Sequence, residues 1–456
     1  MRLGPDTLVH LPADVGTCPY DREAQKIGIV HFGIGAFHRA HQAGYTDCAM
    51  AAGDRDWGIC GVSLRSPDVA RQLNPQDGLY TLTERRGDAA QTRVIGAVRE
   101  VLYAPDQAGA VVTRLADPAC HIASFTVTEK GYARSPDGGL DLIAGRRSLY
   151  PLVAQGLAER RARGLGGLTL LPCDNLAENG KVLARLMEQW LAADMPDMVE
   201  WFRRECRVPS TMVDRIVPRT APQALTALER HLCMRDAGAV FTEGFSQWVI
   251  EDDFAGPRPQ WERHGVQLVN DVAPFETAKL RMLNGAHSLL AYCGLEAGYT
   301  YVHQAVADPR LAALAERLMR DEALPTIPAA PGQDLAAYAG QLMQRFGDPA
   351  LMHRLDQIAM DGSQKIPQRW LDTAAVLTRR SLPCDAIAAG FAAWVRHLAD
   401  GRCVDDPHGE ELHAIAITGG ARGIADRCLG AGTGMTALWS GYQHLAQTLL
   451  SAERED

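Results

Sequence analysis

The segment that most constrains the fold is a short apolar run, residues 27–32, which stops at Gly33-x-Gly35 before a helical pattern over residues 37–50. A strand, a glycine turn and a helix in this order are typical of a dinucleotide-binding turn. The first glycine permits the tight turn, and the second lets a pyrophosphate approach backbone N–H groups. The usual third glycine position holds His38, so the fingerprint is incomplete, and glycines at such turns often have a purely structural role.

Further short apolar runs cover residues 57–64, 122–127 and 168–171, with helical patterns between them. This alternation indicates parallel βα units in a doubly wound sheet. Polar residues follow two of the runs, at residues 128–130 and 174–175. Because ligands bind at the carboxyl ends of the strands in such sheets, we expect the ligand site at this edge.

The pattern changes after residue 272, where strand signals nearly vanish. The last of them covers residues 266–269, and a loop is expected over residues 323–333. Long segments rich in Ala, Leu and Arg, with helical periodicity, cover residues 275–295, 305–321, 336–346 and 386–399. The sequence therefore predicts an α/β fold class, with a Rossmann-like doubly wound NAD-binding domain over residues 1–272 and a mainly α-helical substrate and catalytic domain over residues 273–456.

Composition narrows the partners and the location. A net charge of −9 over 456 residues disfavours nucleic acid and anionic membranes as partners. No stretch approaches the ~18 uncharged apolar residues of a membrane helix, and the first residues lack a signal-peptide pattern. Eleven scattered cysteines without a C-x-x-C pair indicate reduced thiols. We expect a cytoplasmic protein that binds a small molecule. The length of the chain fits two domains, and the oligomeric state is left open.

Asp68 lies just past the second predicted strand. An acid there accepts hydrogen bonds from the adenosine ribose diol and repels a 2′-phosphate, which favours NAD over NADP. Two opposing interpretations are that Asp68 caps a helix after Pro67, and that Arg65 binds a phosphate. The predicted cofactor-binding residues are Phe32, Gly33, Ile34, Gly35, Ala36, Phe37, Asp68 and Thr128.

The segment 278–290 (AKLRMLNGAHSLL) predicts a catalytic helix. At about 100° per residue, Lys279, Asn284 and His287 fall within an arc of roughly 140° on a largely apolar helix. Lys and Asn are seldom buried without a partner. Desolvation would lower the pKa of Lys279, and the neutral amine would then be a usable base near neutral pH. Each residue alone is explained as well by a lysine that reaches solvent or a histidine in the core. The three together, with Asn175 at the end of a strand, favour a site.

Residues 29–43 (IVHFGIGAFHRAHQA) resemble the signature of the polyol-specific long-chain dehydrogenases, a family that includes mannitol dehydrogenases and fructuronate reductases (mannonate oxidoreductases). Further similar motifs follow in the family's order: residues 126–132 (TVTEKGY), 173–180 (CDNLAENG), 212–218 (MVDRIVP), 247–254 (QWVIEDDF), 279–287 and 361–367 (DGSQKIP). The resemblance implies NAD(P)-dependent, zinc-independent oxidation of a secondary alcohol.

The resemblance also implies roles for single residues. Lys279 is similar to the family's general base, and Asn175 and Asn284 to the amides that hold the reacting oxygen. His287 is similar to a substrate-binding residue, and Asp214 and Lys365 to groups of the substrate pocket. In this chemistry, the lysine takes the hydroxyl proton while hydride leaves the carbinol carbon. Each amide donor then stabilises the alkoxide by roughly 3 kcal/mol.

Single residues in and near these motifs favour the uronate branch of the family, with D-mannonate and D-fructuronate as substrates. They include Lys130, Gln364, and Gln357 where mannitol enzymes carry an arginine. A uronate carboxylate needs a cationic partner, which Arg281 or Arg369 could provide. Arg281 lies about 200° around the helix from the lysine two residues before it, so Arg369 is the better candidate.

Three alternatives remain. The first is a mannitol 2-dehydrogenase-type polyol dehydrogenase, with the same chemistry on D-mannitol and D-fructose. The second is a non-catalytic NAD-binding sensor, which would have no need of a base. The third is a zinc enzyme with His38 and His41 as ligands, for which no third ligand lies nearby in the sequence. The predicted cofactor is therefore NAD, with no metal.

Overall fold

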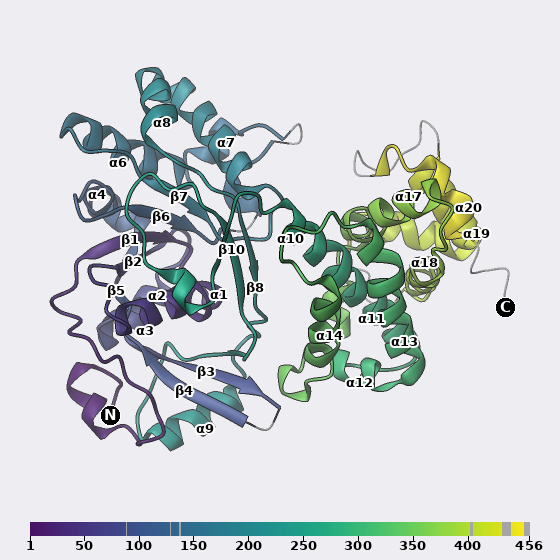
Figure 1. Cartoon of the computed structure of the whole chain (residues 1–456), viewed down its shortest axis with the longest axis horizontal. Helices are drawn as coiled ribbons and strands as arrows, with labels where there is room; N and C mark the ends of the chain where they lie inside the picture. Colours follow the sequence, from purple (N-terminus) through teal and green to yellow (C-terminus); the bar gives the residue numbers. More distant parts are fainter. Residues whose placement is uncertain (88, 128, 136–137, 402–404, 431–438, 451–456) are drawn as a thin grey trace. The chain divides into compact units, whose positions relative to one another are not determined.

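The computed structural model describes residues 1–87, 89–127, 129–135, 138–401, 405–430 and 439–450. The chain forms two compact units, Met1–Val272 and Ala273–Asp456 (Figure 1). The first unit contains all the strands among the described residues, whereas the second is built from helices. None of the helices in the described ranges combines the length and the apolar character that a membrane span needs.

The first unit is organised around a five-stranded parallel sheet. Its strands, in spatial order, are β5 (Val98–Tyr103), β2 (Gly58–Ser63), β1 (Ile27–Phe32), β6 (Ile122–Phe125) and β7 (Thr169–Pro172). After β1 the chain forms β2 and β5 on one side of it, and then returns to form β6 and β7 on the other side. The loops that follow β1 and β6 therefore lie side by side at the point where the order reverses, which is where doubly wound sheets bind ligands.

Helices cover both faces of this sheet because successive side chains of each strand point to opposite faces. Val30 and Phe32 of β1 share an apolar core with residues of α4 (Ala104–Leu115), α6 (Tyr150–Ala162) and α7 (Asn179–Asp194). Ile29, which precedes Val30, belongs to the core of the other face, which includes residues of α1 (Ala36–Ala40) and α2 (Gln42–Ala51). The doubly wound arrangement predicted from the alternating pattern is confirmed.

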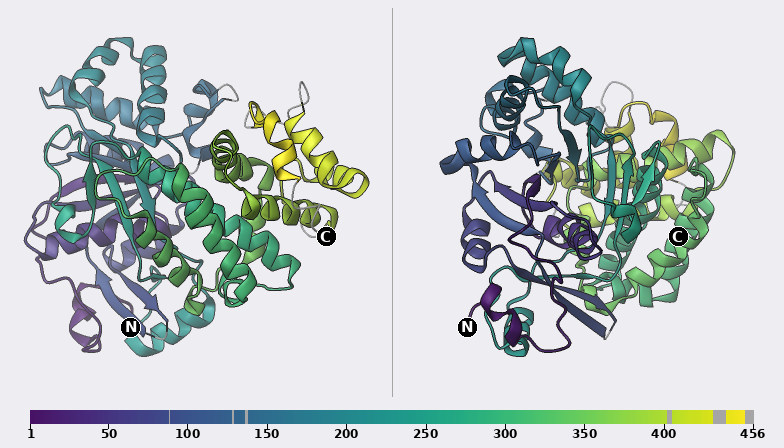
Figure 2. Two further views of the ribbon diagram at one scale, coloured as in Figure 1. Left: turned by 45° about the vertical axis from the view of Figure 1, so that its right-hand side comes forward. Right: turned by 60° about the vertical axis from the view of Figure 1, so that its left-hand side comes forward.

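Two smaller sheets complete the first unit. One contains β11 (Gln267–Val269), β10 (Gln247–Glu251) and β8 (Thr211–Asp214), and the other contains β4 (Ala89–Ile95), β3 (Tyr80–Arg86) and β9 (Val240–Glu243). A separate apolar core joins the second of these sheets to the N-terminal segment and to α9 (Pro222–Leu232). The N-terminal segment and α9 lie side by side in both views of Figure 2. The remaining α-helices of this unit are α3 (Asp68–Leu73), α5 (Leu142–Gly145) and α8 (Val199–Glu205).

The second unit packs its helices around α11 (Gly285–Glu296), whose residues 285–294 are all buried. Its principal neighbours are α18 (Asp385–Ala399), α15 (Leu355–Ala359) and α12 (Val302–Ala307). The other α-helices are α10 (Ala273–Ala278), α13 (Pro309–Arg317), α14 (Leu335–Phe346), α16 (Gly362–Ile366), α17 (Asp372–Arg379), α19 (Gly409–Leu429) and α20 (Ala446–Leu449).

Among the described residues of the second unit, three turns have the wider π-helical hydrogen-bond pattern: η6 (Lys279–Asn284), η7 (Leu318–Ala323) and η10 (Pro367–Leu371). The turn η6 joins α10 to α11, so residues 273–296 form one continuous helix with a π-turn inside it. The expectation of a helix there is confirmed, but the uniform 100° spacing used to place its side chains is wrong across this turn.

The other predicted elements agree with the structure apart from their ends and two interruptions. In the helix expected over residues 305–321, Asp308 separates α12 from α13. The four strands expected around the glycine turn and at its carboxyl edge are present, and β11 is the last strand of the described residues. The helix expected over residues 37–50 breaks at His41, whose backbone has φ −110° and ψ −93°. Six further strands, β3, β4, β5, β8, β9 and β10, were not expected.

Candidate active site

The glycine turn after β1 fits tightly against the neighbouring strands. Gly33 has φ of +95°, a conformation that side-chain-bearing residues rarely adopt. Its N–H donates to the carbonyl of Val62 at 2.9 Å. A Cβ on Gly33 would lie 2.6 Å from the carbonyl oxygen of Thr126 in the loop after β6. Only glycine therefore allows this loop and the turn to meet.

Gly35, by contrast, is exposed, and a Cβ there would meet only the carbonyl oxygen of Gly33, at 3.8 Å. The turn thus presents open backbone at the switch point of the sheet, as a cradle for a dinucleotide pyrophosphate requires. The side chains of Phe32 and Ile34 point into the core, where Phe32 stacks on Phe125. Any cofactor contact of these two residues would therefore be made by the backbone.

His38, at the third glycine position, packs the first helix against the sheet. Its ring stacks on His31 of β1, with 3.4 Å between the ring centroids. The two ring nitrogens of His31 lie 2.8 Å from the hydroxyls of Ser124 and Thr126. The hydroxyl of Thr126 donates to the carbonyl of Gly33 at 2.6 Å. A buried hydrogen-bonded chain thus connects the imidazole pair to the glycine turn.

The other predicted cofactor residues lie around this turn. Ala36 and Phe37 open α1, and the ring of Phe37 stacks on His41 at 5.0 Å. Asp68 is the first residue of α3 and is exposed; its N–H donates to Ser66 Oγ at 3.1 Å. Arg65 is exposed as well, so both side chains are available to a ribose or a phosphate. Thr128 lies outside the described residues.

The loop after β7 carries Asn175, three residues beyond the end of the strand, and Asn175 is exposed. The preceding Asp174 accepts a hydrogen bond from the hydroxyl of the buried Tyr132. Burial raises the pKa of Tyr132 far above its ordinary value, so this hydroxyl remains a donor. The pair ties the loops after β6 and β7 together and orders the backbone next to Asn175. Sequence reasoning did not single out this pair, although both residues lie in the family motifs.

Asp214 belongs to a different sheet from the glycine turn. It is the last residue of β8, is buried, and lies opposite Gln247 in the antiparallel ladder with β10. Asp214, Asn175 and all the predicted cofactor residues belong to the first unit, whereas the other predicted catalytic and substrate residues belong to the second.

In the second unit, Lys279 and Asn284 are the first and last residues of the π-turn η6. The N–H of Gly285 donates to the carbonyl of Leu280, five residues earlier. In an α-helix, residues five apart are separated by roughly 140°. In a π-turn the i→i+5 bond brings them close to one full turn apart, and therefore nearly onto the same side. The π-turn thus groups Lys279 and Asn284 more closely than a regular helix would.

His287 follows one turn later and is almost fully buried, with 8 % of its surface exposed. Its ring contacts Phe346 at 4.7 Å and His353 at 5.2 Å, measured between centroids. Burial, with the nearby His353 and arginines, lowers the pKa of His287 far below its ordinary value. Within the described residues its Nε2 has no hydrogen-bond partner. A neutral imidazole with an unsatisfied nitrogen is suited to a substrate hydroxyl.

Lys365 in α16 and Arg369 in η10 are two neighbouring cations, and η10 packs against both η6 and α11. Lys365 Nζ donates to the carbonyl of Met360 at 2.6 Å and lies 4.0 Å from the carboxylate of Asp361. Burial, and then the charge of Arg369, lower the pKa of Lys365. Burial also lowers the pKa of Arg369, to about 10.

Arg369 is half-buried and uses one edge of its guanidinium on the helix. Its Nη1 donates to Ser288 Oγ at 2.7 Å and to the carbonyl of Asn284 at 3.4 Å. In the described part of the chain it forms no ion pair, and its Nε and Nη2 make no hydrogen bond. Arg281, the other candidate for a carboxylate partner, donates to the carbonyl and the hydroxyl of Thr326, each at 2.9 Å.

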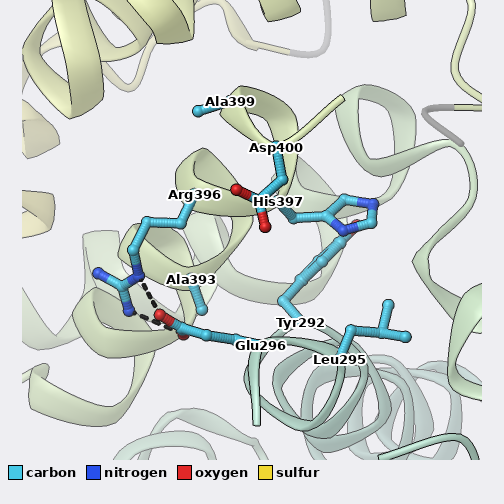
Figure 3. Close-up of a pocket in the computed structure, with 8 residues that line it drawn as sticks. All are labelled: Tyr292, Leu295, Glu296, Ala393, Arg396, His397, Ala399 and Asp400. Atoms are coloured by element: carbon cyan, nitrogen blue, oxygen red, sulfur yellow. Dashed lines mark hydrogen bonds and ion pairs between the residues drawn. The ribbon is translucent and has the colours of Figure 1, made fainter. Parts of the chain in front are cut away.

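A pocket of about 190 Å³ in the second unit is separate from these residues (Figure 3). It lies at the C-terminal ends of α11 and α18, where Arg396 forms an ion pair with Glu296. None of its lining residues is a predicted site residue.

No group of three or more potential metal ligands gathers within the described ranges. His41 Nε2, one of the two histidines weighed as zinc ligands, lies 3.0 Å from the carbonyl of Gln247.

Comparisons with known proteins match nearly the whole chain. The family model described as the mannitol dehydrogenase Rossmann domain matches residues 27–263, and the mannitol dehydrogenase C-terminal domain matches residues 271–422. An uncharacterised oxidoreductase of Escherichia coli, YeiQ, is 40 % identical over 427 residues, with 89 % of this chain and 87 % of the relative covered. The D-mannonate oxidoreductase of Escherichia coli is 39 % identical over 407 residues, with 86 % and 84 % covered.

Among solved structures, the Pseudomonas fluorescens mannitol 2-dehydrogenase in ternary complex with NAD and D-mannitol has a TM-score of 0.85. It is 33 % identical, and the similarity covers 98 % of this chain and 95 % of that one. The doubly wound sheet with its glycine turn, the helical second unit and these matches lead to one conclusion: the chain belongs to the mannitol dehydrogenase family of oxidoreductases.

Proposed function

We propose that the chain is an NAD-dependent, zinc-independent dehydrogenase of a sugar acid, with D-mannonate and D-fructuronate as its substrate pair. The observation that carries the substrate assignment is the cationic pair Lys365 and Arg369. Among the described residues, the only carboxylate within ion-pair distance of either is that of Asp361, at 4.0 Å from Lys365 Nζ.

The physical reason is charge balance. A cation withdrawn from water is unfavourable unless an anion or several acceptors compensate it. The lowered pKa values of Lys365 and Arg369 both have burial as their largest cause. The carboxylate of a sugar acid would supply the missing anion, and the remaining edge of the Arg369 guanidinium can donate two hydrogen bonds to it. An uncharged polyol would leave Arg369 without an anion.

The cofactor assignment is supported by the turn at Gly33 and Gly35 and by the strand order around it. These residues would hold the pyrophosphate through backbone N–H groups, and the exposed Asp68 would accept the ribose hydroxyls. Bound NAD would supply the acceptor for the hydride. The related Pseudomonas fluorescens enzyme is described as a complex with this cofactor.

The chain's own residues would manage the proton and the charge of the reacting oxygen. Lys279 would take the proton of the substrate hydroxyl during oxidation and return it during reduction. The side-chain amides of Asn284 and Asn175 would donate to the oxygen as it acquires negative charge. His287 would orient a neighbouring hydroxyl through its unsatisfied Nε2. Asp214 would bind a further hydroxyl of the substrate.

The principal alternative is a mannitol 2-dehydrogenase-type enzyme for D-mannitol and D-fructose. The complex of the related Pseudomonas fluorescens enzyme with D-mannitol supports this alternative. A non-catalytic NAD-binding sensor is disfavoured because it would have no use for Lys279. The free cysteines of the described residues agree with a reducing, cytoplasmic location, which we also propose.

The test is NADH oxidation by the purified protein with D-fructuronate, D-tagaturonate and D-fructose. A charge-assisted contact to a carboxylate contributes roughly 1.5–3 kcal/mol. We therefore expect kcat/KM for D-fructuronate to exceed that for D-fructose by about ten- to a hundredfold. Equal values, or faster turnover of D-mannitol than of D-mannonate in the reverse direction, would establish the polyol alternative instead.

A further inference from the structure

The π-turn that carries Lys279 and Asn284 is held by side chains from a second π-turn, η10. The indole N–H of Trp370 donates to the carbonyl oxygen of Gly285 at 3.1 Å. Nη1 of Arg369 donates to the carbonyl oxygen of Asn284 at 3.4 Å and to Ser288 Oγ at 2.7 Å. These acceptors lie at the junction between η6 and α11, where the wide register ends and the regular register begins.

The same junction is closely packed. A Cβ on Gly285 would lie 3.3 Å from Leu318 Cδ2, in the third π-turn η7, and 3.4 Å from the carbonyl oxygen of Arg369. Both η7 and η10 pack against η6. Trp370 is fully buried, and its ring fills the space beside Gly390. The three π-turns therefore meet around one glycine, and little free space remains for the helix to change its register.

Register matters here because an α-turn and a π-turn differ by one residue. Converting η6 into a regular turn would rotate one part of the helix relative to the other by about 100°. Lys279 and Asn284 would then be separated by roughly 140° and would no longer share a side. The same rotation would carry the carbonyls of Asn284 and Gly285 away from Arg369 and Trp370. The external hydrogen bonds are therefore specific to the π register.

We propose that Trp370, together with Arg369 through its Ser288 anchor, is a positioning residue that holds the π register of the catalytic helix. The proposal rests on the roles proposed above for Lys279 and Asn284. It assigns Arg369 two uses: one edge of the guanidinium fixes the helix, and the other remains for the substrate. Trp370 is the cleaner probe because its donor is directed only at the helix backbone.

The test compares Trp370→Phe, which removes the N–H donor and keeps most of the ring, with Trp394→Phe. Trp394 is a buried tryptophan of α18 that stacks on Trp439. We expect Trp370→Phe to lower kcat about tenfold or more and to shift the pH dependence of kcat. The dissociation constant of NADH should stay within twofold of the wild-type value. Trp394→Phe should leave kcat within about twofold, since it only weakens packing. Equal values of kcat in the two variants would overturn the proposal.

Ser288→Ala separates the two uses of Arg369. Removal of its acceptor should lower kcat for charged and uncharged substrates by the same factor, whereas loss of a carboxylate contact would affect the charged substrate alone. A selective effect on the charged substrate would contradict the anchoring role.

Amide hydrogen exchange provides a readout that does not depend on any substrate. The amides of residues 280–289 should exchange at least tenfold faster in Trp370→Phe than in Trp394→Phe. If the wild-type protein turns over no sugar acid or polyol, the proposed function fails, and the exchange rates still decide whether Trp370 holds the turn. Identical exchange in the two variants would refute that role.

Discussion

The imidazole of His38 stacks on that of His31, with their planes inclined by 16° and their centroids 3.4 Å apart. In the full dinucleotide fingerprint, a small residue at this position lets the helix approach the strand. Here two rings fill the interval, and His31 is linked through Thr126 to the carbonyl of Gly33. The contact between helix and sheet is therefore made by titratable groups.

This pair should make the first unit sensitive to acid. Burial lowers the pKa of His31 to about 3 and that of His38 far below its ordinary value, with Arg39 and His41 as further positive neighbours of His38. In the unfolded chain both have a pKa of about 6.5. Below that pH the unfolded state takes up protons that the folded state does not bind, so the free energy of unfolding falls as the pH decreases from about 6.5.

Urea unfolding at pH 7.5 and pH 5.5 tests this expectation. His38→Phe keeps a stacked ring without a titratable nitrogen, so this variant should lose less stability on acidification than the wild type. His10→Gln, which removes an exposed imidazole, should behave like the wild type. An unchanged acid response in His38→Phe would show that other groups control it.

Replacement of Lys279 by alanine should remove most turnover and leave NADH binding nearly intact. A general acid–base group contributes about 10²-fold or more to the rate, and the backbone of the glycine turn does not depend on it. Steady-state turnover and fluorescence titration with NADH measure the two effects. Normal turnover in Lys279→Ala would exclude this lysine as the base.

Replacement of Arg369 by glutamine should reduce kcat/KM for D-fructuronate more than for D-fructose. The variant loses both the helix anchor and the carboxylate contact, so the charged substrate should suffer an additional decrease of about ten- to a hundredfold. The ratio of kcat/KM for D-fructuronate to that for D-fructose isolates the carboxylate contact. Ser288→Ala, which removes only the hydrogen bond between Arg369 and the helix, is the matched control. A ratio equal to that of the wild type would remove Arg369 from substrate recognition.

The cofactor preference depends on which exposed side chain after β2 meets the ribose. With Asp68 as the acceptor, kcat/KM for NADH should exceed that for NADPH by roughly tenfold or more, and Asp68→Ser should narrow the difference. Initial rates with both cofactors provide the measurement. A wild-type preference for NADPH would assign the pocket to Arg65.

Activity should survive prolonged treatment with EDTA or 1,10-phenanthroline. The proposed mechanism gives the proton to Lys279 and the charge of the oxygen to two amides, so no step requires a Lewis acid. Turnover before and after chelation, together with metal analysis of the active protein, provides the test. Activity that disappears on chelation and returns with zinc would restore the hypothesis that His38 and His41 are ligands.

The sequence predicted those parts of the fold that are determined by local patterns. Four of the five strands of the central sheet are short apolar runs that end at glycine or polar residues, so their existence and their parallel order followed from alternation with helices. The fifth, β5, has the sequence VREVLY and was not predicted. The strands β3 and β4 escaped prediction because YTLTERR is largely polar and AAQTRVI has three polar residues at its centre. They become strands by pairing with each other and with β9.

The candidate site also has parts that the sequence predicted and parts that it did not. Lys279, Asn284 and His287 could be identified because polar residues on an apolar helix are conspicuous. The π-turn between them could not, because an i→i+5 bond leaves no mark in composition. Gly285 was the available signal: a glycine inside a helix is unfavourable by about 1 kcal/mol relative to alanine and indicates close packing. The anchoring of Arg369 to Ser288 is a tertiary contact that no local pattern encodes.

The boundary between the two units falls at residues 272 and 273, and the helix that contains Lys279 begins there. At 1.5 Å per residue, Lys279 is about 9 Å along the helix axis from this junction. Asn284 and His287 lie further along the same helix, at the end of the π-turn and beyond it. Of the three polar residues on this helix, the proposed base is therefore the nearest along the chain to the first unit.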